Sequence, residues 1–69
     1  MATGTVKWFN SQKGYGFIEP DDKSRDVFVN ISAVEKAALN GLLEGQRVKF
    51  EIEQGRDGRA SAGSLSLID

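Results

Sequence analysis

Residues 13–18 read Lys13-Gly14-Tyr15-Gly16-Phe17-Ile18, a stretch that joins a turn signal, a basic side chain and two aromatics spaced two residues apart. Successive side chains of a β-strand point to opposite faces, so Tyr15 and Phe17 share one face while Ile18 lies on the other. A glycine between two aromatics lets the backbone curve tightly and leaves both rings accessible to a flat partner. The stretch therefore predicts a strand with an aromatic outer face.

The same stretch carries a pattern of nucleic-acid-binding proteins. Its first five residues fit the RNA-recognition pattern Lys/Arg-Gly-Phe/Tyr-Gly/Ala-Phe, Ile18 is a conservative replacement at the next position, and Pro20 stands where the pattern ends in an aromatic. Nucleobases suit such rings because every base has a π-face. Taken alone, the pattern also fits a hairpin strand whose rings pack against a neighbouring strand.

Residues 5–10, Thr5-Val6-Lys7-Trp8-Phe9-Asn10, are rich in β-formers and predict a preceding strand. If Val6 faces the core then Trp8 does too, unless a bulge turns one of the two adjacent aromatics outward. These residues leave both a core position and a surface position open for Trp8. The turn signal Asn10-Ser11-Gln12-Lys13-Gly14 joins the two strands into a hairpin.

Residues 26–31, Asp26-Val27-Phe28-Val29-Asn30-Ile31, predict a third strand. The residues expected on its core face are Val27, Val29 and Ile31. Phe28 and Asn30 fall on the opposite face. In a meander, Phe28 joins Tyr15 and Phe17 on the outer surface, so a third ring extends the aromatic face.

The segment after the third strand predicts a short helical turn within a longer connection. Ser32 followed three residues later by Glu35 has the capping-box spacing that starts a helix. Asn40-Gly41 is a stop signal. The next strand is then expected to begin near Arg47.

Residues 47–53 have the cleanest alternation in the chain and predict a half-buried strand. Its inward residues are expected to be Val48, Phe50 and Ile52. After a glycine-containing turn at 54–59, small residues from Ala60 onward predict a last strand that suits a sheet curling closed. Five short strands roughly ten residues apart, with a longer connection after the third, predict an all-β fold: a small five-stranded antiparallel closed barrel of the OB type.

Composition excludes several classes of function. The chain has 69 residues, so we expect one domain spanning 1–69. It contains neither cysteine nor histidine, which removes disulfides, zinc sites and the usual nucleophile and base pairs. Asp21, Asp22 and Asp26 lack the spacing and central glycine of a calcium loop. The sequence therefore predicts neither an enzyme nor a bound metal or other cofactor.

Charge and hydropathy indicate the partners. The formal net charge of −1 argues against a general polyanion binder. Up to Ile18, however, the chain carries Lys7 and Lys13 and no acidic residue, so the aromatic end is locally positive. No apolar run approaches the roughly 18 residues of a membrane span, and residues 1–5 lack the features of a signal peptide. We expect a cytoplasmic protein without a membrane partner.

Several separate motifs resemble the bacterial cold shock protein family. In chain order they are Gly4-Thr5-Val6-Lys7-Trp8-Phe9-Asn10, the stretch 13–18, Asp26-Val27-Phe28-Val29, Ser32-Ala33-Val34, Glu44-Gly45-Gln46 and Phe50-Glu51. The resemblance covers nearly the whole chain, with the motifs in the right order and spacing. It implies an OB barrel that binds single-stranded RNA and DNA, acts as an RNA chaperone and influences transcription and translation under cold or other stress.

The resemblance also implies a binding surface, and it moves Trp8 from the core to that surface. Carried over by motif, the expected nucleic-acid-binding residues are Lys7, Trp8, Lys13, Tyr15, Phe17 and Phe28, with Phe9 as a partial contributor and Asn10 and Gln12 as contacts to bases or backbone.

Three positions depart from the family pattern. Asn30 and Ile31 stand where the family commonly has a stacking histidine and a phenylalanine, and Leu39 stands where its long loop often has an aromatic. At about 1–3 kcal/mol per stacked base, these replacements predict an affinity lower by one or more decades. Asn30 is expected to hydrogen-bond a base edge instead. The last strand aligns with the family only within a one-residue register.

Two other folds also place aromatic residues on the face of a sheet. An SH3-like barrel would hold a proline-rich peptide on the same aromatic strip and leave Lys7 and Lys13 as ordinary solvated charges. A full RNA-recognition-motif domain is disfavoured because it needs two amphipathic helices. We expect a monomer, although exchange of strands through residues 32–45 would preserve every local pattern and give a dimer.

Overall fold

The computed structural model describes residues 1–55 and 58–68. Within these residues the elements are β1 (Ala2–Asn10), β2 (Tyr15–Pro20), β3 (Val27–Asn30), α1 (Ile31–Lys36), β4 (Arg47–Gln54) and β5 (Ala60–Leu67). The strands close into a barrel in the order β1-β2-β3-β5-β4. This confirms the predicted closed β-barrel with a short helix after the third strand. No helix among the described residues is long and apolar enough to span a membrane.

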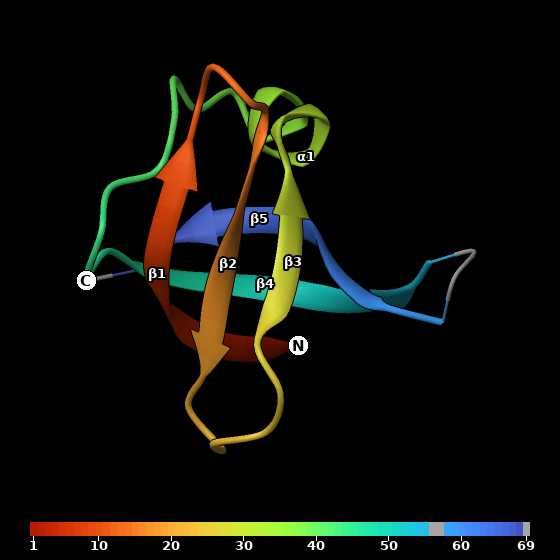
Figure 1. Cartoon of the computed structure of the whole chain (residues 1–69). Helices are drawn as coiled ribbons and strands as arrows, with labels where there is room; N and C mark the ends of the chain where they lie inside the picture. The colour runs from red at the N-terminus through yellow and green to blue at the C-terminus, as the bar shows by residue number, and fades with distance from the viewer. Residues whose placement is uncertain (56–57, 69) are drawn as a thin grey trace.

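The closure of the barrel differs from the predicted antiparallel arrangement at one place. β3 and β5 meet in parallel, at Phe28 and Ser61, whereas the other neighbouring strands are antiparallel. An odd number of strands cannot alternate in direction all the way round a closed ring, so the five described strands must include a parallel pair. Figure 1 shows β1, β2 and β3 side by side, with β4 and β5 crossing behind them and α1 over one end.

The barrel interior contains apolar side chains from every strand and from α1. β2 follows the predicted alternation, since Gly16 and Ile18 are buried while Tyr15 and Phe17 are half-buried on the outer side. The buried core comprises Val6, Ile18, Val27, Val29, Val34, Leu42, Val48, Phe50, Ala62 and Leu65.

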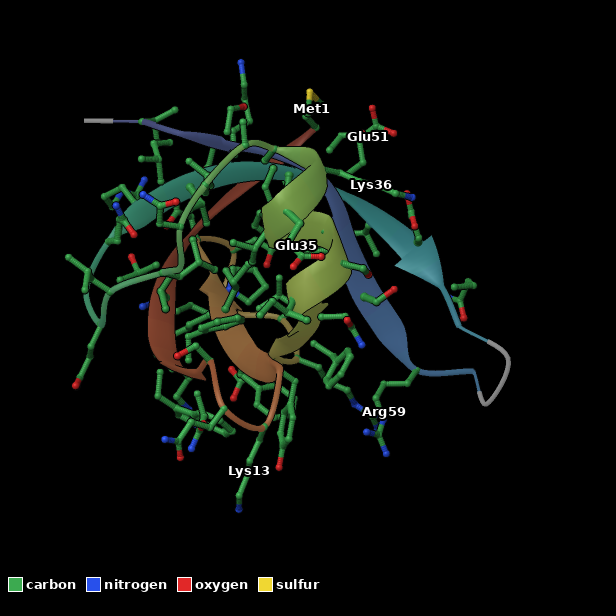
Figure 2. The ribbon with its side chains drawn as sticks, turned by 90° about the horizontal axis from the view of Figure 1, so that it is seen from above. Met1, Lys13, Glu35, Lys36, Glu51 and Arg59 are labelled. Atoms are coloured by element: carbon green, nitrogen blue, oxygen red, sulfur yellow. The ribbon has the colours of Figure 1, made fainter. Side chains whose placement is uncertain are left out.

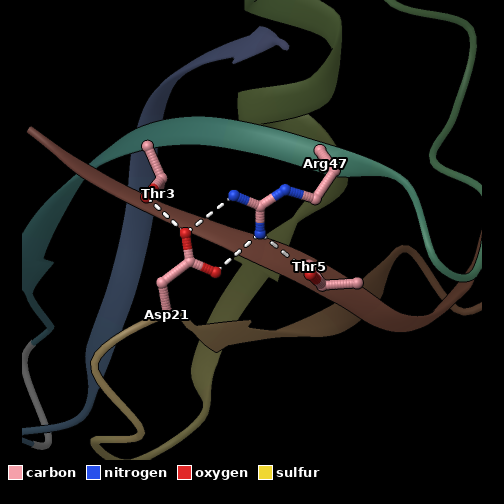
Figure 3. A network of polar contacts seen from close by, with 4 residues as sticks. All are labelled: Thr3, Thr5, Asp21 and Arg47. Carbon is pink, nitrogen blue, oxygen red and sulfur yellow. Dashed lines mark hydrogen bonds and ion pairs between the residues drawn. The ribbon is translucent and has the colours of Figure 1, made fainter. Parts of the chain in front are cut away.

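A polar network on the barrel surface joins β1, the turn after β2 and the start of β4 (Figure 3). Both terminal nitrogens of Arg47 donate to the Asp21 carboxylate, at 2.6 and 2.7 Å. The Thr3 hydroxyl donates to the same carboxylate at 2.6 Å, and Arg47 also donates to the Thr5 hydroxyl at 3.1 Å. The hydrogen bonds from Arg47 and Thr3 hold the pKa of Asp21 well below its usual range.

The start of α1 differs from the predicted capping box. Asn30 is the N-cap, and its Oδ1 accepts a hydrogen bond from the Ser32 backbone N–H at 3.0 Å. Ile31, predicted to end the third strand, is therefore the first helical residue and is only half-buried. The physical reason is that asparagine caps a helix at least as well as serine, so the first available cap is used.

The end of α1 forms a Schellman motif. The Ala38 N–H donates to the Glu35 carbonyl at 2.9 Å, and the Leu39 N–H donates to the Val34 carbonyl at 3.1 Å. Ala38 has a positive φ of 60°, where glycine is the usual residue. Leu39, the residue after Ala38, packs against the core. It therefore has a structural role at the position where the family pattern has an aromatic residue.

The prediction that Ile52 faces the core is wrong, because its side chain is 52% exposed. β1 pairs with β4 only as far as Phe50, and beyond that point the β4–β5 hairpin extends past the barrel (Figure 1). β5 also breaks its alternation: Ala62 and Gly63 are both buried, and Ser64 has a φ of 50°. Part of the turn predicted at 54–59 lies outside the described residues.

Candidate nucleic-acid interface

A bulge in β1 decides the position of Trp8. Val6 pairs with Ile18 and Trp8 pairs with Phe17, so Lys7 is an extra residue between two consecutive pairs. Val6 is 1% exposed, whereas Trp8 is 41% exposed. The bulge interrupts the alternation and turns Trp8 outward. The local sequence left both a core position and a surface position open for Trp8, and the structure shows Trp8 at the surface.

The side chains of Trp8, Tyr15, Phe17 and Phe28 form an aromatic cluster on the outer face of β1, β2 and β3. The Trp8 ring lies edge-on to Tyr15 and Phe17, with centroid distances of 5.5 and 5.4 Å. Phe28 is stacked on Tyr15 at 5.6 Å and lies edge-on to Phe17 at 5.8 Å. These contacts hold the rings in fixed orientations while each keeps part of its area in solvent, which is the geometry of a stacking platform.

Gly16 permits the close approach of β2 to β1 beneath this cluster. A Cβ at Gly16 would collide with the Trp8 carbonyl oxygen and would lie 2.7 Å from the Phe9 Cα atom. The glycine between Tyr15 and Phe17 is therefore required by the backbone of the neighbouring strand. Any larger residue would separate the rings that β1 and β2 bring together.

Lys7 and Lys13 are exposed cations that differ in their partners. Lys13, in the turn between β1 and β2, projects away from the molecule (Figure 2). The Lys7 Nζ donates to the Asp26 carboxylate at 3.0 Å, and both side chains are partly exposed. This hydrogen bond and the charge of Asp26 raise the pKa of Lys7. The Lys7 charge is therefore partly balanced before any ligand arrives.

Three other predicted binding residues have structural roles. The Asn10 Oδ1 accepts a hydrogen bond from the Lys13 N–H at 2.9 Å, which shapes the turn. The Asn30 Oδ1 caps α1. Phe9 is half-buried and packs against the core. Because the Oδ1 atoms of both asparagines are engaged, each side chain can offer a ligand only its NH₂ group as a hydrogen-bond donor. Phe9 contributes mainly to the packing behind the cluster.

Three aspartates of the described residues accept hydrogen bonds from nearby side chains. Asp21 accepts from Arg47, Asp22 accepts from Ser24, and Asp26 accepts from Lys7. In the described ranges 1–55 and 58–68, no group of three or more histidine, cysteine, aspartate or glutamate side chains is placed to hold a metal ion.

Comparison with known proteins identifies the family. The model of the "Cold-shock" DNA-binding domain matches residues 2–68. The chain belongs to the cold-shock domain family. It is 59% identical over 66 residues to a probable cold shock protein, y4cH, of Sinorhizobium fredii (strain NBRC 101917 / NGR234), a match that covers 94% of this chain and 96% of the relative.

Further relatives come from other bacteria. Cold shock protein CspA of Rhizobium meliloti (strain 1021) is 54% identical over 66 residues, covering 94% of this chain and 96% of the relative. Cold shock-like protein CspG of Escherichia coli (strain K12) is 52% identical over 65 residues, covering 94% and 93%. The family model that matches this chain describes a DNA-binding domain, so the family is one of nucleic-acid-binding proteins.

This cold-shock domain brings together most, but not all, of the predicted site residues. The aromatic cluster lies on one face with Lys7 and Lys13 as its cations, while Phe9 lies toward the core. Sequence reasoning missed Asp26 as the partner of Lys7. No spacing rule connects the two, because Lys7 is in β1 and Asp26 immediately precedes β3, and these strands are not neighbours but both pair with β2.

Proposed function

We propose that this chain binds single-stranded RNA and DNA by stacking unpaired bases on the aromatic cluster. The observation that carries this proposal is the gathering of half-exposed rings from three neighbouring strands on one outer face. Each stacked base is worth about 1–3 kcal/mol by alanine substitution. A double helix keeps its base faces stacked inside, so it offers this surface little to bind.

Phosphate contacts play a smaller part in the proposed mode. Lys13 projects into solvent at the end of the β1–β2 hairpin and is placed to meet the backbone of a bound strand. Lys7 must give up its ion pair with Asp26 to bind a phosphate, which reduces the binding free energy that this contact contributes. The NH₂ groups of Asn10 and Asn30 supply hydrogen bonds to bases or backbone.

The proposed consequence of this binding is RNA chaperoning. Holding unpaired bases shifts the equilibrium between paired and open RNA toward the open form by mass action, without an energy source. A monomeric single domain acting on transcripts in the cytoplasm would influence transcription and translation in this way, above all in the cold, where unwanted pairing is most stable.

The intrinsic fluorescence of Trp8 tests the proposal. Trp8 is the chain's sole tryptophan, so its signal reports on the aromatic cluster alone. We expect strong quenching on titration with oligothymidine, weak quenching by a duplex long enough to stay annealed, and no change with a polyproline peptide. Quenching by the peptide alone would instead support the SH3-like interpretation, and equal quenching by both nucleic acids would contradict selective binding of single strands.

A further inference from the structure

A groove of about 520 Å³ lies beside the aromatic cluster, between α1, the end of β3 and the β4–β5 hairpin. Its volume is in the range of pockets that hold small ligands. Phe28 lines the groove and also belongs to the aromatic cluster. A strand whose bases stack on Phe28 therefore has a direct path into the groove.

The groove combines positive charge with an acidic side chain. Lys36 lines it from α1 and Arg59 from the residue just before β5, and Figure 2 shows both on the flank where α1 faces the β4–β5 hairpin. Glu53 of β4 also lines the groove, and its carboxylate sits against Gly63 of β5, where any Cβ would collide with it. With glycine at residue 63, the exposed end of the Glu53 side chain lies directly over the backbone of β5, beside the path of a polyanion.

A carboxylate at such a place opposes phosphate binding unless it gains hydrogen bonds from the ligand. It offers two adjacent acceptor oxygens. Guanine presents two adjacent donors, N1–H and the N2 amino group, on its Watson–Crick edge. Adenine, cytosine and uracil or thymine each place an acceptor next to their donor, so the second carboxylate oxygen would face an acceptor. The Glu53 carboxylate therefore favours guanine and penalises the other bases.

We propose that this groove is a base-selective subsite that takes a guanine of the bound single strand, with Glu53 accepting the two donors of its Watson–Crick edge. The inference rests on the proposed single-strand binding and adds to it a preference at one position. The Asn30 Oδ1 caps α1, so its NH₂ group is left as one of the donors on the wall of the groove. Lys36 balances the phosphate that accompanies the base.

A guanine scan tests the inference. The affinity of heptathymidine is compared with that of seven variants that each carry a single guanine, one variant for each position. We expect at least one position at which guanine tightens binding by about fivefold or more, the low end of what a bidentate base contact gives. Hypoxanthine at that position keeps N1–H but lacks the N2 amino group, so it should lose most of the gain.

Two matched variants separate Glu53 from general charge effects. Glu53→Gln should bring the guanine-to-thymine affinity ratio close to one, whatever happens to the affinity for heptathymidine. The control is Glu51→Gln, because Glu51 is an outward-facing residue of β4 that does not line the groove, and this variant should leave the ratio unchanged. A ratio near one at every position of the wild type, or a preference that survives Glu53→Gln, would overturn this inference alone. Failure to bind heptathymidine would overturn the proposed function and this inference with it.

Discussion

Phe17 lies at the centre of the aromatic cluster, with ring contacts to Trp8, Tyr15 and Phe28. We expect Phe17→Ala to weaken oligothymidine binding by about 1–3 kcal/mol, or roughly 5- to 150-fold, because it removes a stacking surface and loosens the neighbouring rings. The anisotropy of a labelled oligonucleotide measures this without relying on Trp8. Leu43→Ala, which shortens a 73% exposed side chain outside the cluster, is the control. Equal losses in the two variants would argue against a role for stacking.

Asp21 illustrates how a single ionisable residue links stability to pH. Hydrogen bonds from Arg47 and Thr3 lower its pKa in the native state. The charged form therefore stabilises the fold at any pH above the pKa of an unfolded aspartate, about 3.9. This stabilisation is lost as the pH falls from that value toward the lower native pKa. We expect Asp21→Asn to lower the melting temperature at pH 7, with a smaller difference from wild type at pH 3. Glu44→Gln, an exposed carboxylate outside the network, should show no such trend. A constant difference for Asp21→Asn would contradict the linkage.

At the level of elements, the Schellman motif gives α1 a position at which glycine should stabilise the fold more than the native residue does. Ala38 holds a φ of 60°, which costs an L-residue with a Cβ about 1–2 kcal/mol. We expect Ala38→Gly to raise the free energy of unfolding by about 0.5–1 kcal/mol, after the greater entropy of glycine in the unfolded chain is subtracted. Urea denaturation measures the change.

Ala33→Gly provides the matched control for this prediction. Ala33 lies inside α1, where glycine is unfavourable by roughly 1 kcal/mol, so the same chemical change should lower stability there. Destabilisation by both substitutions would show that the C-terminal end of α1 does not adopt the left-handed conformation in solution.

The alternation of apolar residues predicted β2, β3 and the first half of β4 well. β2 and β3 follow it, since Ile18, Val27 and Val29 are buried as expected. It failed at Ile52, where β4 continues beyond the last residue paired with β1. The sequence raised a bulge as one way to place Trp8 outward but did not decide it. Bulges and strand ends depend on which strands meet, and a single strand's pattern does not contain that information.

Closure of the whole barrel creates relations that no local pattern predicts. The parallel contact of β3 with β5 follows from the odd number of strands in the described barrel. The Lys7–Asp26 ion pair joins β1 to the residue that precedes β3, although β1 and β3 are not neighbouring strands. The resemblance to cold shock proteins located the rings of the site, whereas the partners of its charged residues required the three-dimensional structure.

The charge of the whole molecule agrees with the proposed mode of binding, in which stacking supplies more of the affinity than phosphate contacts do. The formal net charge is −1, and Lys7 is already paired with Asp26. Neutralising roughly two to four phosphates of a single strand gives a shallow dependence of log affinity on log salt concentration, about −1.5 to −3. A binder that relied on phosphate contacts would need many more exposed cations along its surface.

The most direct test of stacking-led binding is therefore the affinity of wild-type protein for oligothymidine measured across a range of salt concentrations. We predict a slope between about −1.5 and −3, with substantial affinity remaining at high salt because base stacking is not screened. A slope near about −6, with binding abolished at high salt, would show that phosphate contacts dominate and would contradict the role assigned to the aromatic cluster.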